Sequence, residues 1–143
     1  MMNQGLMRIH AGETELRACN AVSEPYGLAL SEEQALRLVQ REQDTLRAAG
    51  RISFGSGILA KLAFAFCDSP FIQRDEYADT LDALQEDFYA FKNESEDLLS
   101  DDELVEAMAS VFNGSAQGSL EMMEELTFGD LCRAARGGCG WKD

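Results

Sequence analysis

The chain has 143 residues and a formal net charge of −14, from 26 acidic and 12 basic side chains. This charge makes binding to nucleic acid or to an anionic membrane surface unfavourable, because both are themselves negatively charged. The sequence contains one histidine and no Cys-x-x-Cys motif, so it offers few groups for catalysis. We therefore lean towards a protein that is not an enzyme, with no catalytic residues and no cofactor.

The length is sufficient for one hydrophobic core. We expect residues 1–12 to be a mobile N-terminus, residues 13–136 to be a single helical domain, and residues 137–143 to be a flexible, glycine-rich tail. No stretch has the apolar length of a signal peptide or a membrane span, which favours a cytoplasmic location. Cys132 and Cys139 are close enough in sequence to form a disulfide or share a metal ion, although reduced thiols are typical of the cytosol.

The first helices are indicated by their start and stop signals. A short helix is expected over residues 14–22. Ser31 followed by Gln34 has the spacing of a capping box, and Gly50 is suited to a left-handed stop. The sequence therefore predicts a helix over residues 32–49.

The next segment, residues 58–67, is apolar except for Lys61 and is followed by Pro70. A helix that is apolar nearly all round is normally the buried centre of a bundle. Before it, residues 55–57 read Gly-Ser-Gly and could hold an anion on backbone amides at the helix N-terminus. The alternative, which we favour, is a tight turn that leads into the helix.

Residues 74–92 show the clearest helical periodicity. Apolar side chains recur at intervals of three and four residues: Tyr77, Leu81, Leu84, Phe88 and Phe91. Carboxylates follow the same intervals two positions earlier: Asp75, Asp79, Asp82 and Glu86. Two positions correspond to about 200° of rotation, so the carboxylates are predicted on the outward face of this helix. The apolar stripe could pack into the core or form a helix–helix contact in a homo-oligomer.

Ser100 and Glu103 repeat the capping-box spacing and predict a helix over residues 101–113. Further helical segments are expected over residues 120–126 and, more weakly, from Thr127 onward. No run of β-branched residues alternates with polar ones, so strands are not expected. The predicted fold class is all-α, a single-domain bundle of about five helices.

The acidic side chains are concentrated in one part of the chain. Residues 75–106, called the acidic segment below, contain 13 acidic side chains and one basic side chain, Lys92. The rest of the chain is nearly balanced, with 13 acids and 11 bases. A glycosidase pair or a di-metal site would need inward-facing carboxylates, and a di-metal site also histidines. We therefore interpret the segment as a solvated face or as a docking surface for a basic partner protein.

A second candidate site has the spacing of an EF-hand calcium loop. Positions 1, 3, 5 and 12 of a twelve-residue loop are occupied by Asn113, Ser115, Gln117 and Glu124. Calcium prefers oxygen ligands, and carboxylates raise its affinity. Only Glu124 supplies a carboxylate at these four positions, so calcium binding is an alternative and not the favoured reading.

Several strings of the sequence occur together in a known family. They are Cys19–Asn20, Tyr26–Ser31, Gly50–Leu59, Phe64–Pro70, Phe91–Ser95 and Gln117–Leu120. In these strings the chain resembles a bacterial domain of unknown function found in small uncharacterised proteins. The resemblance covers about residues 19–126 and implies a single intracellular helical domain. It brings no established activity and no catalytic residues.

Polar residues of these strings lie between predicted helices and could converge on one ligand or enzymatic site. The candidates are Asp68, Ser69, Lys92, Asn93 and Gln117. The leading hypothesis remains a non-enzymatic interaction or regulatory protein that uses the acidic segment. The calcium loop and the inter-helix site are the alternatives.

Overall fold

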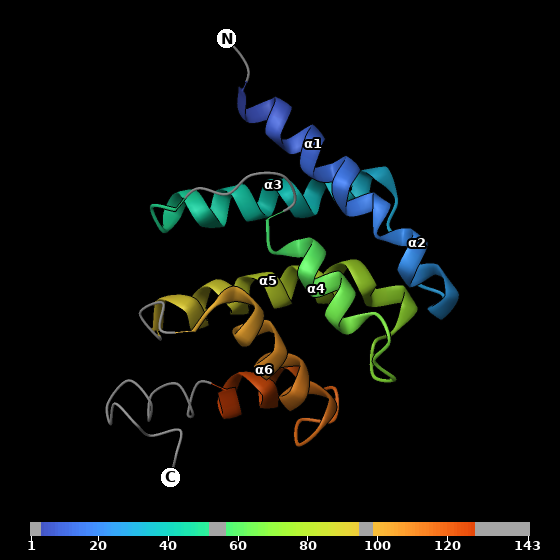
Figure 1. Ribbon diagram of the computed structural model, residues 1–143, viewed down its shortest axis with the longest axis vertical. Helices are drawn as coiled ribbons and strands as arrows, with labels where there is room; N and C mark the ends of the chain where they lie inside the picture. The colour runs from blue at the N-terminus through green and yellow to red at the C-terminus, as the bar shows by residue number, and fades with distance from the viewer. Residues whose placement is uncertain (1–3, 52–56, 95–98, 128–143) are drawn as a thin grey trace. The chain divides into compact units, whose positions relative to one another are not determined.

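The computed structural model describes residues 4–51, 57–94 and 99–127 (Figure 1). Within these ranges the chain is helical and contains no strand, so the predicted all-α class and approximate helix number are confirmed. The elements are α1 (Gln4–Ala18), α2 (Asn20–Ser23), η1 (Glu24–Tyr26), α3 (Glu32–Ala48), α4 (Leu59–Phe66), η2 (Arg74–Glu76), α5 (Tyr77–Glu94) and α6 (Asp101–Asn113). Residues 120–127 are helical as well.

The chain divides into two compact units. The first comprises Met1–Asp68 and Ile72–Glu86, and the second comprises Ser69–Phe71 and Asp87–Asp143. The helix α5 belongs to both units, with its first ten residues in one and the rest in the other. Each unit is described separately below.

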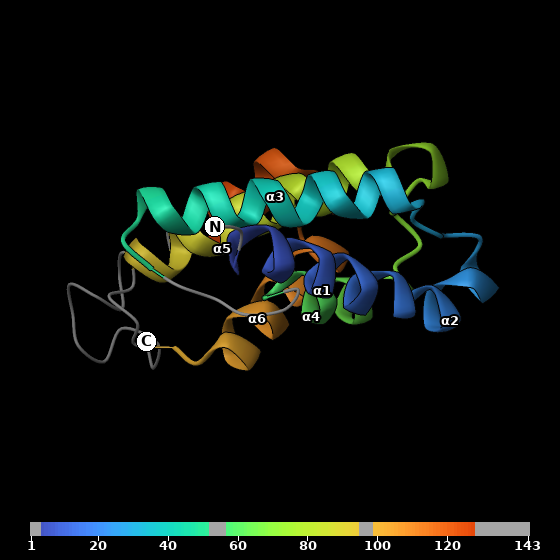
Figure 2. The ribbon, with the colours of Figure 1, turned by 90° about the horizontal axis from the view of Figure 1, so that it is seen from above.

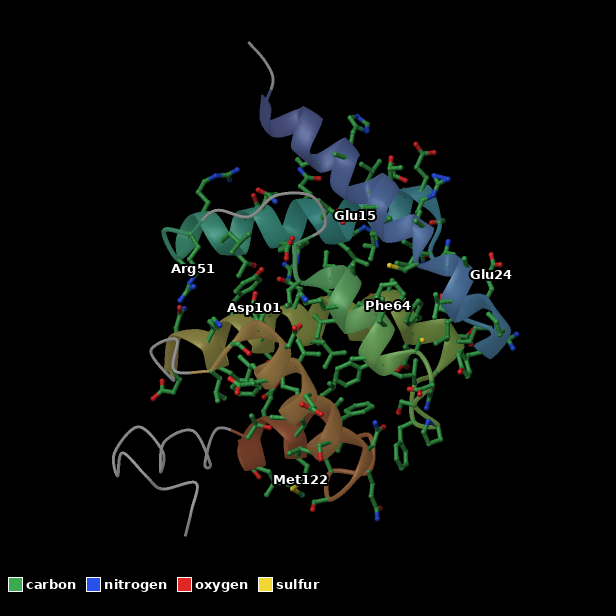
Figure 3. The ribbon with its side chains drawn as sticks, in the orientation of Figure 1. Glu15, Glu24, Arg51, Phe64, Asp101 and Met122 are labelled. Atoms are coloured by element: carbon green, nitrogen blue, oxygen red, sulfur yellow. The ribbon has the colours of Figure 1, made fainter. Side chains whose placement is uncertain are left out.

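In the first unit, α1 packs against α3 (Figure 2). Leu16 of α1 and Val39 of α3 are fully buried. The helix α4 contributes four of its eight residues to the core: Leu59, Leu62, Ala63 and Phe66. Its opposite side carries Phe64, which is 52% exposed, so α4 is buried along one face and is not enclosed all round as the sequence predicted (Figure 3).

The start of the chain also differs from the expectation. The helix α1 begins at Gln4, ten residues before the predicted start at Thr14, and therefore occupies most of the segment that we expected to be mobile. No Ser/Thr-x-x-Glu/Gln capping box precedes this start in the sequence. The mobility of residues 1–12 remains a prediction.

In the second unit, the core forms between α5, α6 and the segments that follow them. The buried residues include Phe88, Phe91, Leu104, Met108, Phe112 and Met123. Phe71 packs edge-on against Phe112, with ring centroids 6.4 Å apart. All five members of the apolar stripe on α5 are buried, three in the first unit and two in the second.

Both predicted capping boxes are confirmed. Ser31 Oγ accepts from the Gln34 amide at 3.1 Å, and Gln34 Oε1 accepts from the Ser31 amide at 2.9 Å. Ser100 and Glu103 form the same pair of bonds at the start of α6. The left-handed φ of +73° at Gly50 follows the end of α3, as the sequence predicted.

Thr127 is the last described residue of the helix over residues 120–127. The rest of the helix predicted from Thr127, the tail at residues 137–143, and Cys132 and Cys139 lie outside the described residues. None of the described helices is long and apolar enough to cross a membrane.

Candidate interaction surface

The first unit carries the part of the acidic segment that lies on η2 and the start of α5. Asp75, Asp79 and Glu86 are exposed, and Asp82 is half-buried. Helical spacing explains this arrangement, because the apolar stripe of the same helix faces the core. The four carboxylates that the sequence placed on the outward face are thus accessible to solvent to different degrees.

Asp82 is held by a base on the neighbouring helix. Arg41 Nε of α3 donates to Asp82 Oδ1 at 3.1 Å, and Gln85 Nε2 donates to the same oxygen at 3.3 Å. The hydrogen bond and charge of Asp82 raise the pKa of the Arg41 guanidinium. This ion pair is partly exposed, so it contributes little to stability.

A shallow groove adjoins this ion pair between α3 and the start of α5. It is lined by Gln34, Arg37, Leu38, Arg41, Ala78, Asp79 and Asp82. Its charged groups are of both signs: the guanidinium groups of Arg37 and Arg41 and the carboxylates of Asp79 and Asp82. Such a lining suits a polar ligand.

In the second unit, the acidic segment continues on the first turns of α6. Asp101, Asp102, Glu103 and Glu106 are all exposed, and Figure 3 labels the first of them. Carboxylates at a helix N-terminus are favoured by the backbone amides and the helix dipole. The N-terminus of α6 therefore stabilises these carboxylates without the need for a bound cation.

The single base of the acidic segment is turned inward. The Lys92 side chain is 12% exposed, and its ammonium donates to the Leu99 carbonyl at 2.7 Å and contacts Asp101 at 2.8 Å. Its Nζ also lies 6.0 Å from the centre of the Phe88 ring. Among the described residues of the segment, the charges that face solvent are consequently almost all carboxylates.

The five inter-helix residues do not form one cluster. Ser69 Oγ donates to Asn113 Oδ1 at 2.5 Å, at the C-terminal end of α6, whereas Lys92 contacts Asp101 at its N-terminal end. The thirteen residues of α6 separate these two points by about 18 Å. Asn93 and Gln117 are exposed, and Asp68 belongs to the first unit. Whether any of them has a functional role remains a prediction.

In the predicted calcium loop, the glycine at residue 118 is explained by its backbone conformation and its packing. Gly118 has a φ of +85°, and a Cβ there would lie 2.5 Å from the Phe71 side chain. Asn113 Oδ1 already accepts a bond from Ser69, Ser115 and Gln117 are exposed, and Glu124 is half-buried. In the described part of the chain, no group of three His, Cys, Asp or Glu residues could hold a metal ion. Calcium binding here remains a prediction.

The sequence reading missed a buried carboxylate. Glu42 of α3 is fully buried, and its Oε2 accepts from the Ile58 amide at 2.9 Å, just before α4. Gly57, with a φ of +59°, lies so close that a Cβ would collide with the Glu42 carboxylate. Of the Gly-Ser-Gly turn that the sequence offers for an anion, residues 55 and 56 lie outside the described residues, and the amide that follows the turn, that of Ile58, is bonded by Glu42. The sequence does hold a sign of this burial, because Glu42 lies four residues from both Leu38 and Leu46, on the apolar stripe of α3.

Two cysteines and a tyrosine are buried in the first unit. Cys19 and Cys67 are both free thiols. Burial raises the pKa of each thiol, and it raises the pKa of Tyr77 to about 12, although a hydrogen bond with Ser23 opposes that rise. A raised pKa keeps a thiol protonated and unreactive near neutral pH. These groups are therefore suited to packing and not to nucleophilic catalysis.

The chain belongs to DUF6323, a family of unknown function whose family model matches residues 15–140. The predicted membership of a family of unknown function is thereby confirmed. No curated protein and no solved structure matches the chain.

Proposed function

We propose that the protein is a non-enzymatic interaction protein with a regulatory role, whose acidic segment binds a basic partner protein. The observation that carries this proposal is the orientation of Lys92. Because the only base of the segment contacts the Leu99 carbonyl and Asp101, it offsets the charge of Asp101, and the segment contains no second base for its other exposed carboxylates. A surface of one sign attracts an oppositely charged partner over several ångströms and speeds association.

The other hypotheses have less support. His10 is exposed on α1, and the two described cysteines are buried with raised pKa values, so no nucleophile is paired with a base among these groups. No observation favours calcium binding or an enzymatic site at the inter-helix loops. The free thiols of Cys19 and Cys67 support a reducing compartment, and the proposal includes a cytoplasmic location.

A charge-matched pair of variants tests the proposal. The acidic-segment variant combines Asp75→Asn, Asp79→Asn, Glu86→Gln and Glu106→Gln. The control variant neutralises the same number of exposed acids elsewhere, through Glu24→Gln, Glu32→Gln, Glu33→Gln and Asp68→Asn. The probe is a fluorescein-labelled peptide of lysine and glycine, titrated with each protein at low ionic strength and followed by fluorescence anisotropy.

We expect the acidic-segment variant to bind the peptide about tenfold more weakly than the wild type, since four lost pairs of up to about 0.5 kcal/mol each amount to at most about 2 kcal/mol. The control variant should stay within about twofold of the wild type, because its neutralised charges lie outside the segment. Equal weakening in the two variants would show that only the net charge matters, and the proposal would then be wrong.

A further inference from the structure

A second surface of the second unit lies outside the acidic segment, on the helix over residues 120–127. Met123 and Thr127 of this helix are buried and define its inward side. Four residues on the outward side are exposed: Glu121, Met122, Glu125 and Leu126. Figure 3 shows Met122 at the outer edge of the unit.

The four exposed residues form two parallel stripes. Residues four apart lie on the same side of a helix, so Glu121 and Glu125 form an acidic stripe, and Met122 and Leu126 form an apolar one. The stripes are separated by about 100° of helix rotation and share the outward arc. Met122 is 43% exposed and Leu126 is 38% exposed, and both are large apolar side chains.

We propose that this face docks an amphipathic helix of a partner protein that carries an apolar stripe beside a basic stripe. Charge complementarity selects this occupant, because the carboxylates of Glu121 and Glu125 favour lysine or arginine next to the apolar contact. Methionine suits such a face, since its flexible side chain adapts to different apolar partners. A helix laid along the face would cover both apolar side chains with residues spaced three or four apart.

A labelled model peptide of leucine and lysine provides the probe, with its leucines on one helical face. A scrambled peptide of the same composition has no apolar face and serves as the peptide control. The test variant is Met122→Ser with Leu126→Ser. The matched control is Val22→Ser with Phe64→Ser, which removes two exposed apolar side chains from the first unit.

We expect the test variant to bind the amphipathic peptide about tenfold more weakly, because two apolar contacts are lost. The control variant should stay within about twofold, and the test substitutions should not change binding of the scrambled peptide. Glu121→Gln with Glu125→Gln should weaken binding at low salt more than at high salt.

Equal affinity of the test variant and the wild type would overturn the inference. Loss of binding to the amphipathic peptide in the acidic-segment variant but not in the test variant would also overturn the inference. That result would leave the proposed function intact. Sedimentation that shows a dimer in the wild type and a monomer in the test variant would assign the face to a second copy of this chain, and it would also overturn the inference.

A measurement on the wild-type protein needs no substitution. With carbon-13 in the methionine methyl groups, addition of the amphipathic peptide should shift the Met122 resonance more than those of Met108 and Met123, which are fully buried. Equal shifts of the three resonances, or none, would contradict docking at this face.

Discussion

At the scale of single residues, the contact between Glu42 and the start of α4 explains why residue 57 is a glycine. Gly57 combines a left-handed φ with a neighbour that leaves no room for a Cβ. Gly50 has a left-handed φ of +73° but nothing within 4 Å of a Cβ. Alanine at residue 50 therefore meets only the strain of the left-handed backbone, whereas alanine at residue 57 also collides with the Glu42 carboxylate.

We predict that Gly57→Ala lowers the free energy of unfolding by about 2–4 kcal/mol, whereas Gly50→Ala costs about 1–2 kcal/mol. Urea denaturation followed by circular dichroism measures both values. A loss at Gly57 no larger than the loss at Gly50 would mean that the Glu42 carboxylate moves aside without cost.

Tyr77 gives a second prediction at this scale. Burial raises its pKa to about 12 from the usual 10, so the folded chain keeps the phenolic proton to higher pH than the unfolded chain does. The contribution of this pKa difference to the free energy of unfolding is fully present below pH 10. It is lost as the pH rises towards 12, by about 3 kcal/mol in total.

The difference in ultraviolet absorbance between the wild type and Tyr77→Phe isolates this ionisation. We expect its midpoint near pH 12 in the folded protein. A midpoint near 10 under conditions where circular dichroism shows the helices intact would contradict the buried position of Tyr77.

At the scale of elements, Lys92 ties α5 to the start of α6 within the second unit. We predict that Lys92→Met lowers the free energy of unfolding by about 2 kcal/mol, because the Leu99 carbonyl and Asp101 lose a charged partner. Arg47→Met, which breaks an exposed pair with Asp44, should cost less than about 0.5 kcal/mol. Similar losses in the two variants, measured by urea denaturation, would show that the Lys92 contacts are no stronger than a surface pair.

The capping boxes allow a prediction about helix α6. Ser100→Ala should cost about 1 kcal/mol of unfolding free energy, since the Glu103 amide loses its acceptor. Ser110→Ala, an exposed position inside the same helix, should be neutral or slightly stabilising because alanine has the higher helix propensity. If thermal unfolding shows no difference between the two variants, the cap at Ser100 does not stabilise α6.

The same elements show what a sequence can and cannot predict here. Capping boxes, helix stops and the stripe on α5 depend on residues a few positions apart, so α3, α5 and α6 were predicted closely. The early start of α1 has no capping box to reveal it, and the exposure of Phe64 depends on packing between distant segments. The Glu42 contact joins residues sixteen positions apart in sequence, and no local pattern reveals such a partner.

The candidate surface was predictable for a similar reason. Charge along the sequence is visible without a structure, and helical spacing places most carboxylates of the acidic segment outward. The inward turn of Lys92 was not visible, because it depends on the Leu99 carbonyl and Asp101 beyond the end of α5. Likewise, the distance between Ser69 and Lys92 follows from their contacts at opposite ends of α6.

At the scale of the whole molecule, the central claim is that the net charge of −14 acts through one segment and not through the surface in general. Salt screens the attraction between the segment and a basic partner. The affinity of the protein for that partner must therefore fall as the salt concentration rises. The slope of this dependence reports how many charges take part.

The most direct measurement is the affinity of the lysine- and glycine-rich peptide over a range of salt concentrations, for the wild type, the acidic-segment variant and the control variant. We expect the logarithm of the wild-type association constant to fall steeply with the logarithm of salt concentration, with a similar slope in the control variant and a shallower one in the acidic-segment variant. Three equal slopes would contradict a localised acidic docking surface.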